Sequence, residues 1–249
     1  FFFPPPPANP DSSTSRGLGD VYKRQVNVGK NKVMAVSIYP KEGNPLWEDY
    51  STKAVIQTLK TYSKFTFDYP YPKAVSVHAK NIGMEYPMIC FNFGRPEEDG
   101  SYSDRTKFGM ISVIIHEVGH NYFPMIVNSD ERQWGWMDEG LDTFVQYLTE
   151  QDFGISYPES IGGLDKYPSR RGAPKNIVPY MAGNQEFISP IMSNPENVYQ
   201  LGPNAYAKPA TALNILRETI MGKEAFDHAF KTYSQRKNSK RRIFIQSIL

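Results

Sequence analysis

The pentapeptide His-Glu-Val-Gly-His at residues 116–120 constrains this chain more than any other feature. An apolar run precedes it and Pro124 follows it, which predicts a helix from Lys107 to Phe123. Residues four positions apart on a helix differ by about 40° around its axis, so His116 and His120 face one side and can share a metal ion. Glu117 lies slightly further around the same face. The alternative is a pair of histidines packed in an apolar core.

A candidate for a third ligand lies nineteen residues after His120, at Glu139. A second helix is predicted from Met137 to Glu150, and Glu139 points away from its apolar stripe. Two histidines and a glutamate, with a fourth position left for water, form a catalytic zinc site. Asp138 competes for the ligand role and ranks second, as a residue that orients a ligand or caps the helix. The alternative for Glu139 is a surface residue favoured by the helix dipole.

Composition narrows the class of protein. The chain has 249 residues, of which 40% are hydrophobic and 22% charged, enough for one sizeable domain with a buried core. The net charge is +2, but six basic residues follow Asp227 with no acid among them, so the body is mildly acidic and unsuited to a nucleic-acid surface. A single cysteine, Cys90, excludes an internal disulfide and a CxxC metal site. The longest apolar run is far below the roughly 18 residues of a membrane span.

The rest of the chain mixes strand-like and helix-like patterns, which indicates an α+β fold. Strands are predicted at 32–40, 74–79 and 87–93, and further helices at 46–65, 206–220 and 223–233, with Gly222 ending the first of the last two. Residues 151–205 are rich in Pro and Gly. A structureless loop of that length is uncommon inside a domain, so short helical turns packed over a cleft are expected there.

Four motifs occur in the order found in one enzyme family. Gly83-Met84-Glu85 comes first and the pentapeptide His116–His120 second. Glu139 then lies in a W-x-x-E-G context, and Tyr206 and Lys208 form a Y-x-K segment. With this ordered set the chain resembles the M1 zinc metallopeptidases, the gluzincin aminopeptidases, between Val33 and Tyr233.

The resemblance implies a thermolysin-like catalytic domain, mainly helical with a small mixed sheet. It implies one Zn²⁺ per chain, held by His116, His120 and Glu139, which would lower the pKa of a bound water. Glu117 would take the proton of that water as general base and later protonate the leaving amine. Tyr206 would stabilise the tetrahedral oxyanion as a hydrogen-bond donor.

The same resemblance implies a substrate. Gly83, Met84 and Glu85 would bind it, with Glu85 anchoring a free α-amino group and its edge strand pairing with the peptide backbone. The expected partners are therefore peptides with a free N-terminus, from which N-terminal amino acids are removed. Oligomeric state and cellular location stay open.

Three positions depart from the family pattern. Tyr86 stands where the exopeptidase signature has Asn, Asn121 replaces the Gln after the second histidine, and Pro209 replaces the Gly of the tyrosine segment. The first departure keeps two other activities open, those of a gluzincin endopeptidase and of an epoxide hydrolase. A non-catalytic M1-like binding scaffold is a further alternative, although such a scaffold would be expected to have lost a ligand or the base.

The two ends differ in composition from the body. Residues 1–25 are expected to be a non-native or disordered leader, because they lack the features of a signal peptide and Asp20–Gln25 resembles a sequencing adapter read in frame. Residues 26–235 form the expected catalytic domain, without the family's N-terminal β domain and C-terminal helical domain. Residues 236–249 are expected to be a basic tail, frameshifted or truncated.

Overall fold

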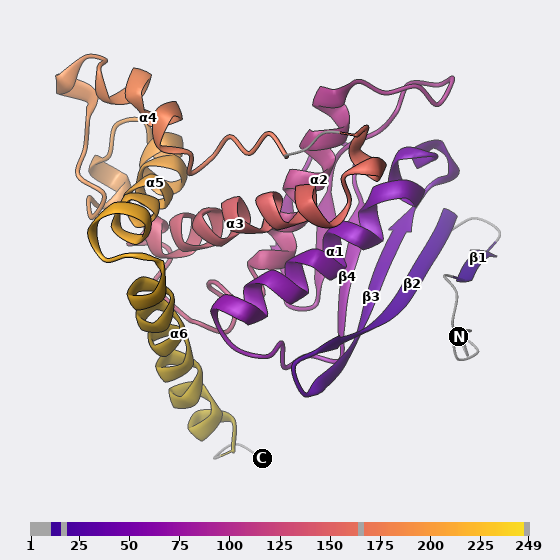
Figure 1. The fold of residues 1–249 in the computed structure, drawn as a ribbon, viewed down its shortest axis with the longest axis horizontal. Coiled ribbons are helices and arrows are strands. Elements are labelled where there is room, and N and C mark those ends of the chain that lie inside the picture. Colours follow the sequence, from indigo (N-terminus) through magenta and orange to yellow (C-terminus); the bar gives the residue numbers. More distant parts are fainter. Residues whose placement is uncertain (1–10, 16–18, 164–166, 247–249) are drawn as a thin grey trace.

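A mixed six-stranded sheet forms one side of the molecule (Figure 1). The computed structural model describes residues 11–15, 19–163 and 167–246. The strand order is β1-β2-β3-β4-β6-β5, in which β3, β4 and β6 are parallel and the outer pairs antiparallel. The strands are β1 (Asp11–Ser15), β2 (Gly19–Val28), β3 (Asn31–Tyr39), β4 (Lys73–His78), β5 (Met84–Tyr86) and β6 (Ile89–Asn92).

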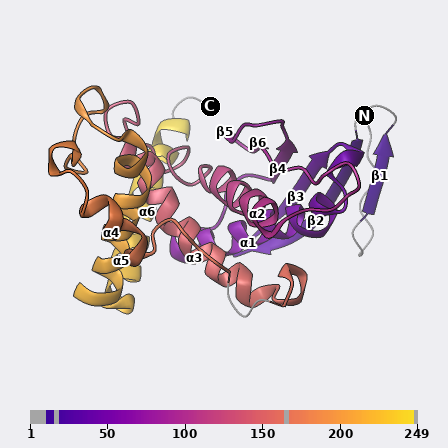
Figure 2. The same ribbon diagram turned by 90° about the horizontal axis from the view of Figure 1, so that it is seen from above.

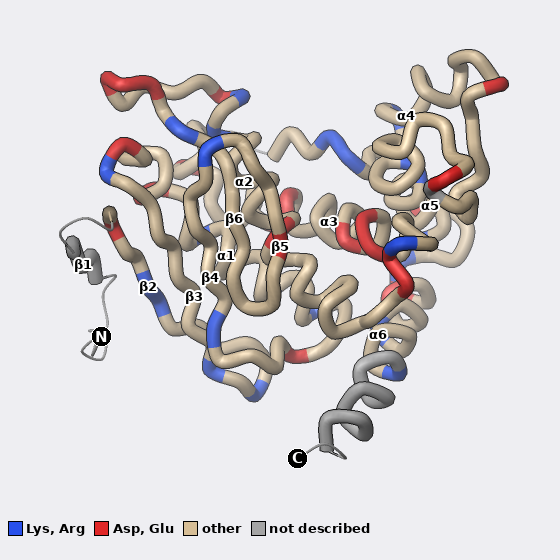
Figure 3. The backbone as a smooth tube through the Cα atoms, turned by 180° about the vertical axis from the view of Figure 1, so that it is seen from behind, with Lys and Arg blue, Asp and Glu red and all other residues tan. Residues whose placement is uncertain are grey.

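Two helices, α1 (Leu46–Phe65) and α2 (Asp104–Gly119), pack against the sheet, and a third, α3 (Leu141–Ser156), packs against both of them. All three are seen from above in Figure 2. The alternation of β3 explains the packing, since every second residue from Val33 to Tyr39 is buried on the side of α1 while the residues that alternate with them are partly exposed. Seen from behind, the central strands lie in front of α1 and α2 and carry few charges (Figure 3).

Helix α2 carries the HExxH motif and starts earlier than predicted. The hydroxyl of Ser103 accepts a hydrogen bond from the backbone N–H of Thr106, which is an N-cap. The α-helix ends at Gly119 rather than Phe123, because the backbone tightens into turns in which the N–H of Asn121 bonds to Val118. His120 is therefore the C-cap residue, whose backbone angles are still those of a right-handed helix, and its side chain stays on the face of His116.

The second half of the chain forms the predicted short turns and helices. A five-residue π-helical turn, η2 (Trp136–Gly140), leads into α3. After α3 come η3 (Glu159–Ile161), α4 (Pro174–Met181), η4 (Gln185–Phe187), η5 (Pro195–Asn197), η6 (Pro203–Ala207), α5 (Lys208–Ile215), η7 (Leu216–Ile220) and α6 (Lys223–Gln246). A short turn, η1 (Lys41–Gly43), precedes α1. The helix predicted to end at Tyr233 instead continues to Gln246, while Gly222 has the left-handed backbone of the predicted cap, with φ +82°.

The predicted α+β class is confirmed, but the first strands were missed. Strand β2 begins at Gly19 and pairs with β3 over its whole length, so part of the expected leader lies in the sheet. Residues 1–10 and 16–18 of that leader lie outside the described residues. Its foreign origin, like the domain limits 26–235 and the nature of the basic tail, stays a prediction. Within the described ranges, we found no helix that combines the length and the apolar character of a membrane span.

Candidate metal centre

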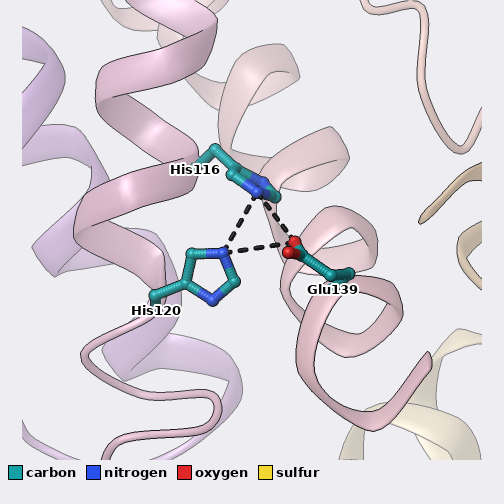
Figure 4. A group of neighbouring side chains, drawn as sticks. All are labelled: His116, His120 and Glu139. Atoms are coloured by element: carbon teal, nitrogen blue, oxygen red, sulfur yellow. Dashed lines mark hydrogen bonds and ion pairs between the residues drawn. The ribbon is translucent and has the colours of Figure 1, made fainter. Parts of the chain in front are cut away.

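The structure brings the three predicted metal ligands together (Figure 4). Nε2 of His116 lies 3.1 Å from Nε2 of His120 and 3.1 Å from Oε2 of Glu139. Oε2 of Glu139 lies 3.3 Å from Nε2 of His120, which closes the triangle. A tetrahedral zinc ion about 2.0–2.1 Å from each ligand atom requires them to be roughly 3.3–3.4 Å apart. The donor set and its spacing therefore fit zinc.

Local structure accounts for this convergence. The two histidines come from the last turn of α2, and both rings are buried in the angle between α2 and α3. Glu139 lies in the wide π-helical turn η2, and such turns are often found at functional sites because they re-aim a side chain.

The Nδ1 atoms of both histidines face acceptors, which leaves each Nε2 directed at the centre of the triangle. Nδ1 of His116 lies 2.8 Å from Oδ2 of Asp142 and 3.0 Å from Oε1 of Gln146. Nδ1 of His120 lies 2.8 Å from the carbonyl oxygen of Phe123 and 3.1 Å from Oδ1 of Asp138. Asp138 thus contacts the His120 ring from the side away from the triangle. The sequence analysis ranked Asp138 behind Glu139 as a ligand and expected it to orient a ligand or cap the helix, and this position suits the orienting role.

The carboxylates around the ligand triangle favour protonated histidines when no metal ion is bound. Burial opposes a charge on His116, but the Asp142 carboxylate and Glu139 outweigh it and raise its pKa to about 9. The pKa of His120 is raised in the same way, against burial, by Asp142, Asp138 and Glu139. Burial raises the pKa of Glu139, yet its bonds to the two rings lower it well below the usual range. A metal ion would take the place of these protons, so metal binding here releases protons.

Glu117 lies beside the triangle, on α2. Its side chain is buried, and its Oε2 atom has no hydrogen-bond partner among the described residues. Burial, the dominant cause, raises the pKa of Glu117 to about 7 although both histidines act to lower it. A carboxyl group with a pKa near 7 is partly protonated at pH 7, so it can both accept and return a proton.

The predicted substrate-binding residues line up beside Glu117. A Cβ atom on Gly83 would lie 2.5 Å from Oε1 of Glu117 and 2.9 Å from Cγ2 of Val113, so a larger residue here would displace these side chains. Met84 and Glu85 follow in β5, an outer strand of the sheet. Ligand-type atoms of Glu85, Glu117 and His120 all lie within 4.8 Å of one another.

Asn121 links the hairpin of β5 and β6 to the end of helix α2. Its Oδ1 accepts a 2.7 Å hydrogen bond from the backbone N–H of Met88, in the turn between β5 and β6. Met88 has a φ of +66°, a conformation that this bond helps to hold. The amide thus connects the last residues of α2 to the hairpin that carries Glu85. Tyr86, at the altered signature position, is 49% exposed at the end of β5.

Tyr206, in η6, contacts two of the three predicted ligands. Its hydroxyl donates a 2.6 Å hydrogen bond to Oε1 of Glu139, and its ring stacks against that of His116 at 5.7 Å between centroids. The guanidinium of Arg171 lies 4.7 Å from the centroid of the tyrosine ring. Burial, with the nearby Glu139 carboxylate, raises the pKa of Tyr206, so the phenol keeps its proton at neutral pH and remains a donor.

The contact between η2 and η6 depends on the glycine of the W-x-x-E-G motif. A Cβ atom on Gly140 would lie 2.5 Å from Cγ of Pro209 and 2.9 Å from the carbonyl oxygen of Ala205. Gly140 therefore lets the tyrosine segment pack directly on the turn that holds Glu139. Pro209, which departs from the family pattern, fills the space that this glycine leaves.

The model of the peptidase family M1 domain matches residues 50–247. This chain belongs to peptidase family M1. Human "Endoplasmic reticulum aminopeptidase 1" is 24% identical to this M1 domain over 216 residues, 82% of the chain and 22% of the relative. "Probable aminopeptidase 1" of Saccharolobus solfataricus is 22% identical over 228 residues, 87% of the chain and 27% of the relative. The chain thus spans about a quarter of these relatives.

Solved structures confirm the fold of the M1 domain. The M1 zinc metallopeptidase of Deinococcus radiodurans superposes with a TM-score of 0.58 at 18% identity, covering 88% of this chain and 45% of that one. Native yeast LTA4 hydrolase gives a TM-score of 0.53 at 15% identity, covering 86% and 33%. The predicted thermolysin-like gluzincin architecture is confirmed.

Several residues of the M1 site were missed by the sequence analysis. Asp142 and Gln146 both face His116, and Tyr62 on α1 donates to Asp142. A signal was present, because Asp142 and Gln146 follow Glu139 by three and seven residues and so lie on the same side of a helix. Tyr62 is far away in sequence and carries no such signal.

Proposed function

We propose that this M1 domain is the catalytic domain of a zinc aminopeptidase, which hydrolyses the first peptide bond of substrates with a free N-terminus. The observation that carries the proposal is that three further groups lie around the triangle of ligand atoms. They are the acid–base carboxylate of Glu117, the phenol of Tyr206 and the carboxylate of Glu85 on an outer strand. Each of the three comes from a different element, namely α2, η6 and β5. The names of the relatives support the same activity.

The chemistry begins with the residues around the triangle. His116, His120 and Glu139 would hold zinc, which when bound lowers the pKa of a water molecule and polarises a carbonyl group. Glu117 takes a proton from the attacking water and returns it to the leaving amine. Its burial suits both transfers, because a carboxylate removed from water binds a proton more readily than an exposed one.

Tyr206 and Glu85 act on different parts of the substrate. The hydroxyl of Tyr206 already points at the ligand triangle, where it can donate to the oxygen that becomes negative in the transition state. Glu85 would pair with the protonated α-amino group of the substrate, close to Glu117. The outer edge of β5 offers backbone groups to an extended peptide. Together these positions select the first residue of a chain.

The first experiment measures zinc by elemental analysis of the purified chain, together with hydrolysis of an amino-acid anilide. We expect one zinc per chain, lost in Glu139→Ala and retained in Glu131→Ala, a matched change at an exposed glutamate in the same loop region. A folded wild-type protein that binds no zinc would overturn the proposal.

An endopeptidase remains the second candidate, because Tyr86 replaces the signature Asn at the end of β5. Comparison of a free-amine peptide with its acetylated form, in wild type and Glu85→Ala, separates the two. An aminopeptidase should strongly prefer the free amine and lose that preference in the variant. Equal cleavage of both peptides by the wild type would favour the endopeptidase.

A further inference from the structure

One carboxylate near the site has no part in the chemistry proposed above. Asp142, in the first turn of α3, is fully buried. Its Oδ1 accepts a 2.9 Å hydrogen bond from the hydroxyl of Tyr62 on α1. Its Oδ2 makes no hydrogen bond of good geometry within the described ranges and faces Nδ1 of His116 at 2.8 Å.

A carboxylate at this depth requires a specific partner. Burial of an unpaired charge is costly, and one phenol bond offsets only part of that cost. Tyr62 is itself fully buried, with its ring 5.2 Å from that of Tyr122, so it cannot turn toward solvent. Among the described residues, the group that can carry positive charge and directly faces Oδ2 of Asp142 is the imidazole of His116. The arrangement therefore directs the charge of Asp142 at one metal ligand.

The glycine of the HExxH motif, Gly119, leaves space for the Asp142 carboxylate. A Cβ atom on Gly119 would lie 2.2 Å from Oδ1 of Asp142 and 2.3 Å from the hydroxyl of Tyr62. The backbone of Gly119 is ordinary helix, so glycine is needed here for space rather than for its conformation. Because this residue has no side chain, a group from α1 and a group from α3 can meet against the turn that joins the two histidines.

His116 also has a neutral acceptor, which sharpens the role of the charged one. The amide of Gln146 donates from Nε2 to Glu150 at 2.9 Å, and this bond turns its Oε1 toward Nδ1 of His116 at 3.0 Å. Gln146 alone could satisfy the N–H of the ring. Asp142 adds a negative charge, which makes the opposite nitrogen a stronger donor to a metal ion.

We propose that Asp142, held in place by Tyr62, is a positioning residue that fixes the His116 ring and strengthens it as a zinc ligand. The proposal rests on the metal site of the proposed function. Nδ1 of His120 instead faces the carbonyl oxygen of Phe123 and Oδ1 of Asp138.

The test measures the zinc dissociation constant of the purified chain by competition with a chromophoric chelator. Asp142→Asn preserves shape and removes the charge, and we expect it to weaken zinc binding roughly 10- to 100-fold. Asp152→Asn is the matched control, since Asp152 lies on the same helix and accepts a 3.1 Å bond from Thr61, also on α1, but touches neither histidine. We expect its zinc affinity to equal that of the wild type.

A second variant keeps the test decisive if Asp142→Asn fails to fold. Tyr62→Phe removes the hydroxyl that donates to Oδ1 and to the backbone carbonyl oxygen of Asp142, and we expect it to raise the dissociation constant roughly two- to tenfold. The absorption spectrum of the cobalt-loaded protein should shift in both variants and not in Asp152→Asn. A folded Asp142→Asn, or failing it Tyr62→Phe, with wild-type zinc affinity and cobalt spectrum would overturn the positioning role alone. A wild type without zinc would instead overturn the proposed function.

Discussion

The two sides of the metal site are built differently. On the side of α2 and α3, His116, His120 and Asp142 are buried in the packed core. On the other side, Tyr206 belongs to a layer of short helices in which α4 has no buried residue. Apolar side chains of that layer are exposed, with Met192 at 67% and Tyr199 at 58%. The two predicted histidine ligands thus come from the closely packed part of the molecule and the phenol donor from a more loosely packed part.

The difference suggests a division of work. Metal ligands require geometry within tenths of an ångström, which a close-packed core supplies. A donor that acts on a substrate has to admit that substrate first, and segments with few buried contacts open at a lower free-energy cost. We therefore expect changes on the core side to alter zinc affinity, and changes on the outer side to alter turnover with zinc retained.

The largest effect on turnover is expected from Glu117→Gln, which removes the acid–base group and keeps the shape. General acid–base catalysis contributes typically about 10²–10⁴-fold, so kcat should fall by roughly 10³-fold. Zinc content should stay at the wild-type level, because Glu117 is not a corner of the ligand triangle. Anilide hydrolysis and elemental analysis on one preparation check both points. Loss of zinc in this variant would show that Glu117 belongs to the metal site itself.

We expect Glu117→Gln to stabilise the zinc-free protein by an amount that depends on pH. The pKa of Glu117 is raised from 4.5 to about 7 in the fold, so between these values the native state binds more protons than the unfolded state. Wild type therefore loses stability as pH rises through this range, and Glu117→Gln does not. At pH 8 the variant should be more stable by at most about 3 kcal/mol, and at pH 4 the two should agree. Urea unfolding at both pH values measures the difference.

The next largest effect is expected from Tyr206→Phe, on the outer side of the comparison. Loss of one oxyanion donor costs about 10²–10³-fold in kcat. The variant should keep zinc, and its KM should change little, because the donor acts mainly in the transition state. Steady-state kinetics with the anilide substrate separate the two constants. A fall in kcat of less than about fivefold would remove Tyr206 from the chemistry.

Gly140→Ala tests how the two sides are joined. The new methyl group would collide with Pro209 and with the backbone of Ala205, which has no free rotation by which to move away. Overpacking costs about 1–3 kcal/mol, and the displaced segment carries Tyr206, so kcat should fall roughly tenfold. Gly135→Ala is the control, since its Cβ would meet Ala205 at an ordinary 3.6 Å. Equal melting temperatures and rates in the two variants would show that this contact does not position Tyr206.

The fold was predictable where periodicity is strong. The helix at Leu46–Phe65 matches its prediction to the residue, because its apolar spacing is regular throughout. The end of α2 was wrong by four residues, since the choice between an α-helix and tight turns at its end depends on local bonds that the pattern does not encode. Strand β2 was missed because its polar sequence reads as a strand only beside β3.

The site was predictable where function requires a short local spacing. His116, His120 and Glu117 follow from one pentapeptide and Glu139 from its place on the next predicted helix, whereas Tyr206 required the order of the family motifs. Tyr62 could not be found in this way, because it reaches Asp142 from 80 residues away through the packing of α1 against α3. Contacts of this kind depend on how helices cross, and a single sequence does not determine that.

The smallest effect is expected from Arg171→Gln, at the outer edge of the loose side. The guanidinium lies over the face of Tyr206, opposes the rise in the pKa of that phenol, and is exposed to solvent. A cation–π contact of this kind contributes about 0.5–1 kcal/mol, so kcat/KM should fall about two- to fivefold with zinc affinity unchanged. Arg170→Gln is the control, because it removes a neighbouring exposed charge that does not stack on Tyr206. If both variants lowered kcat/KM equally, general attraction of the substrate by positive charge would explain the effect. If only Arg171→Gln did so, the outer side of the site would owe part of its order to this one exposed contact, in contrast to the core side, where buried acceptors face the Nδ1 atoms of both histidines.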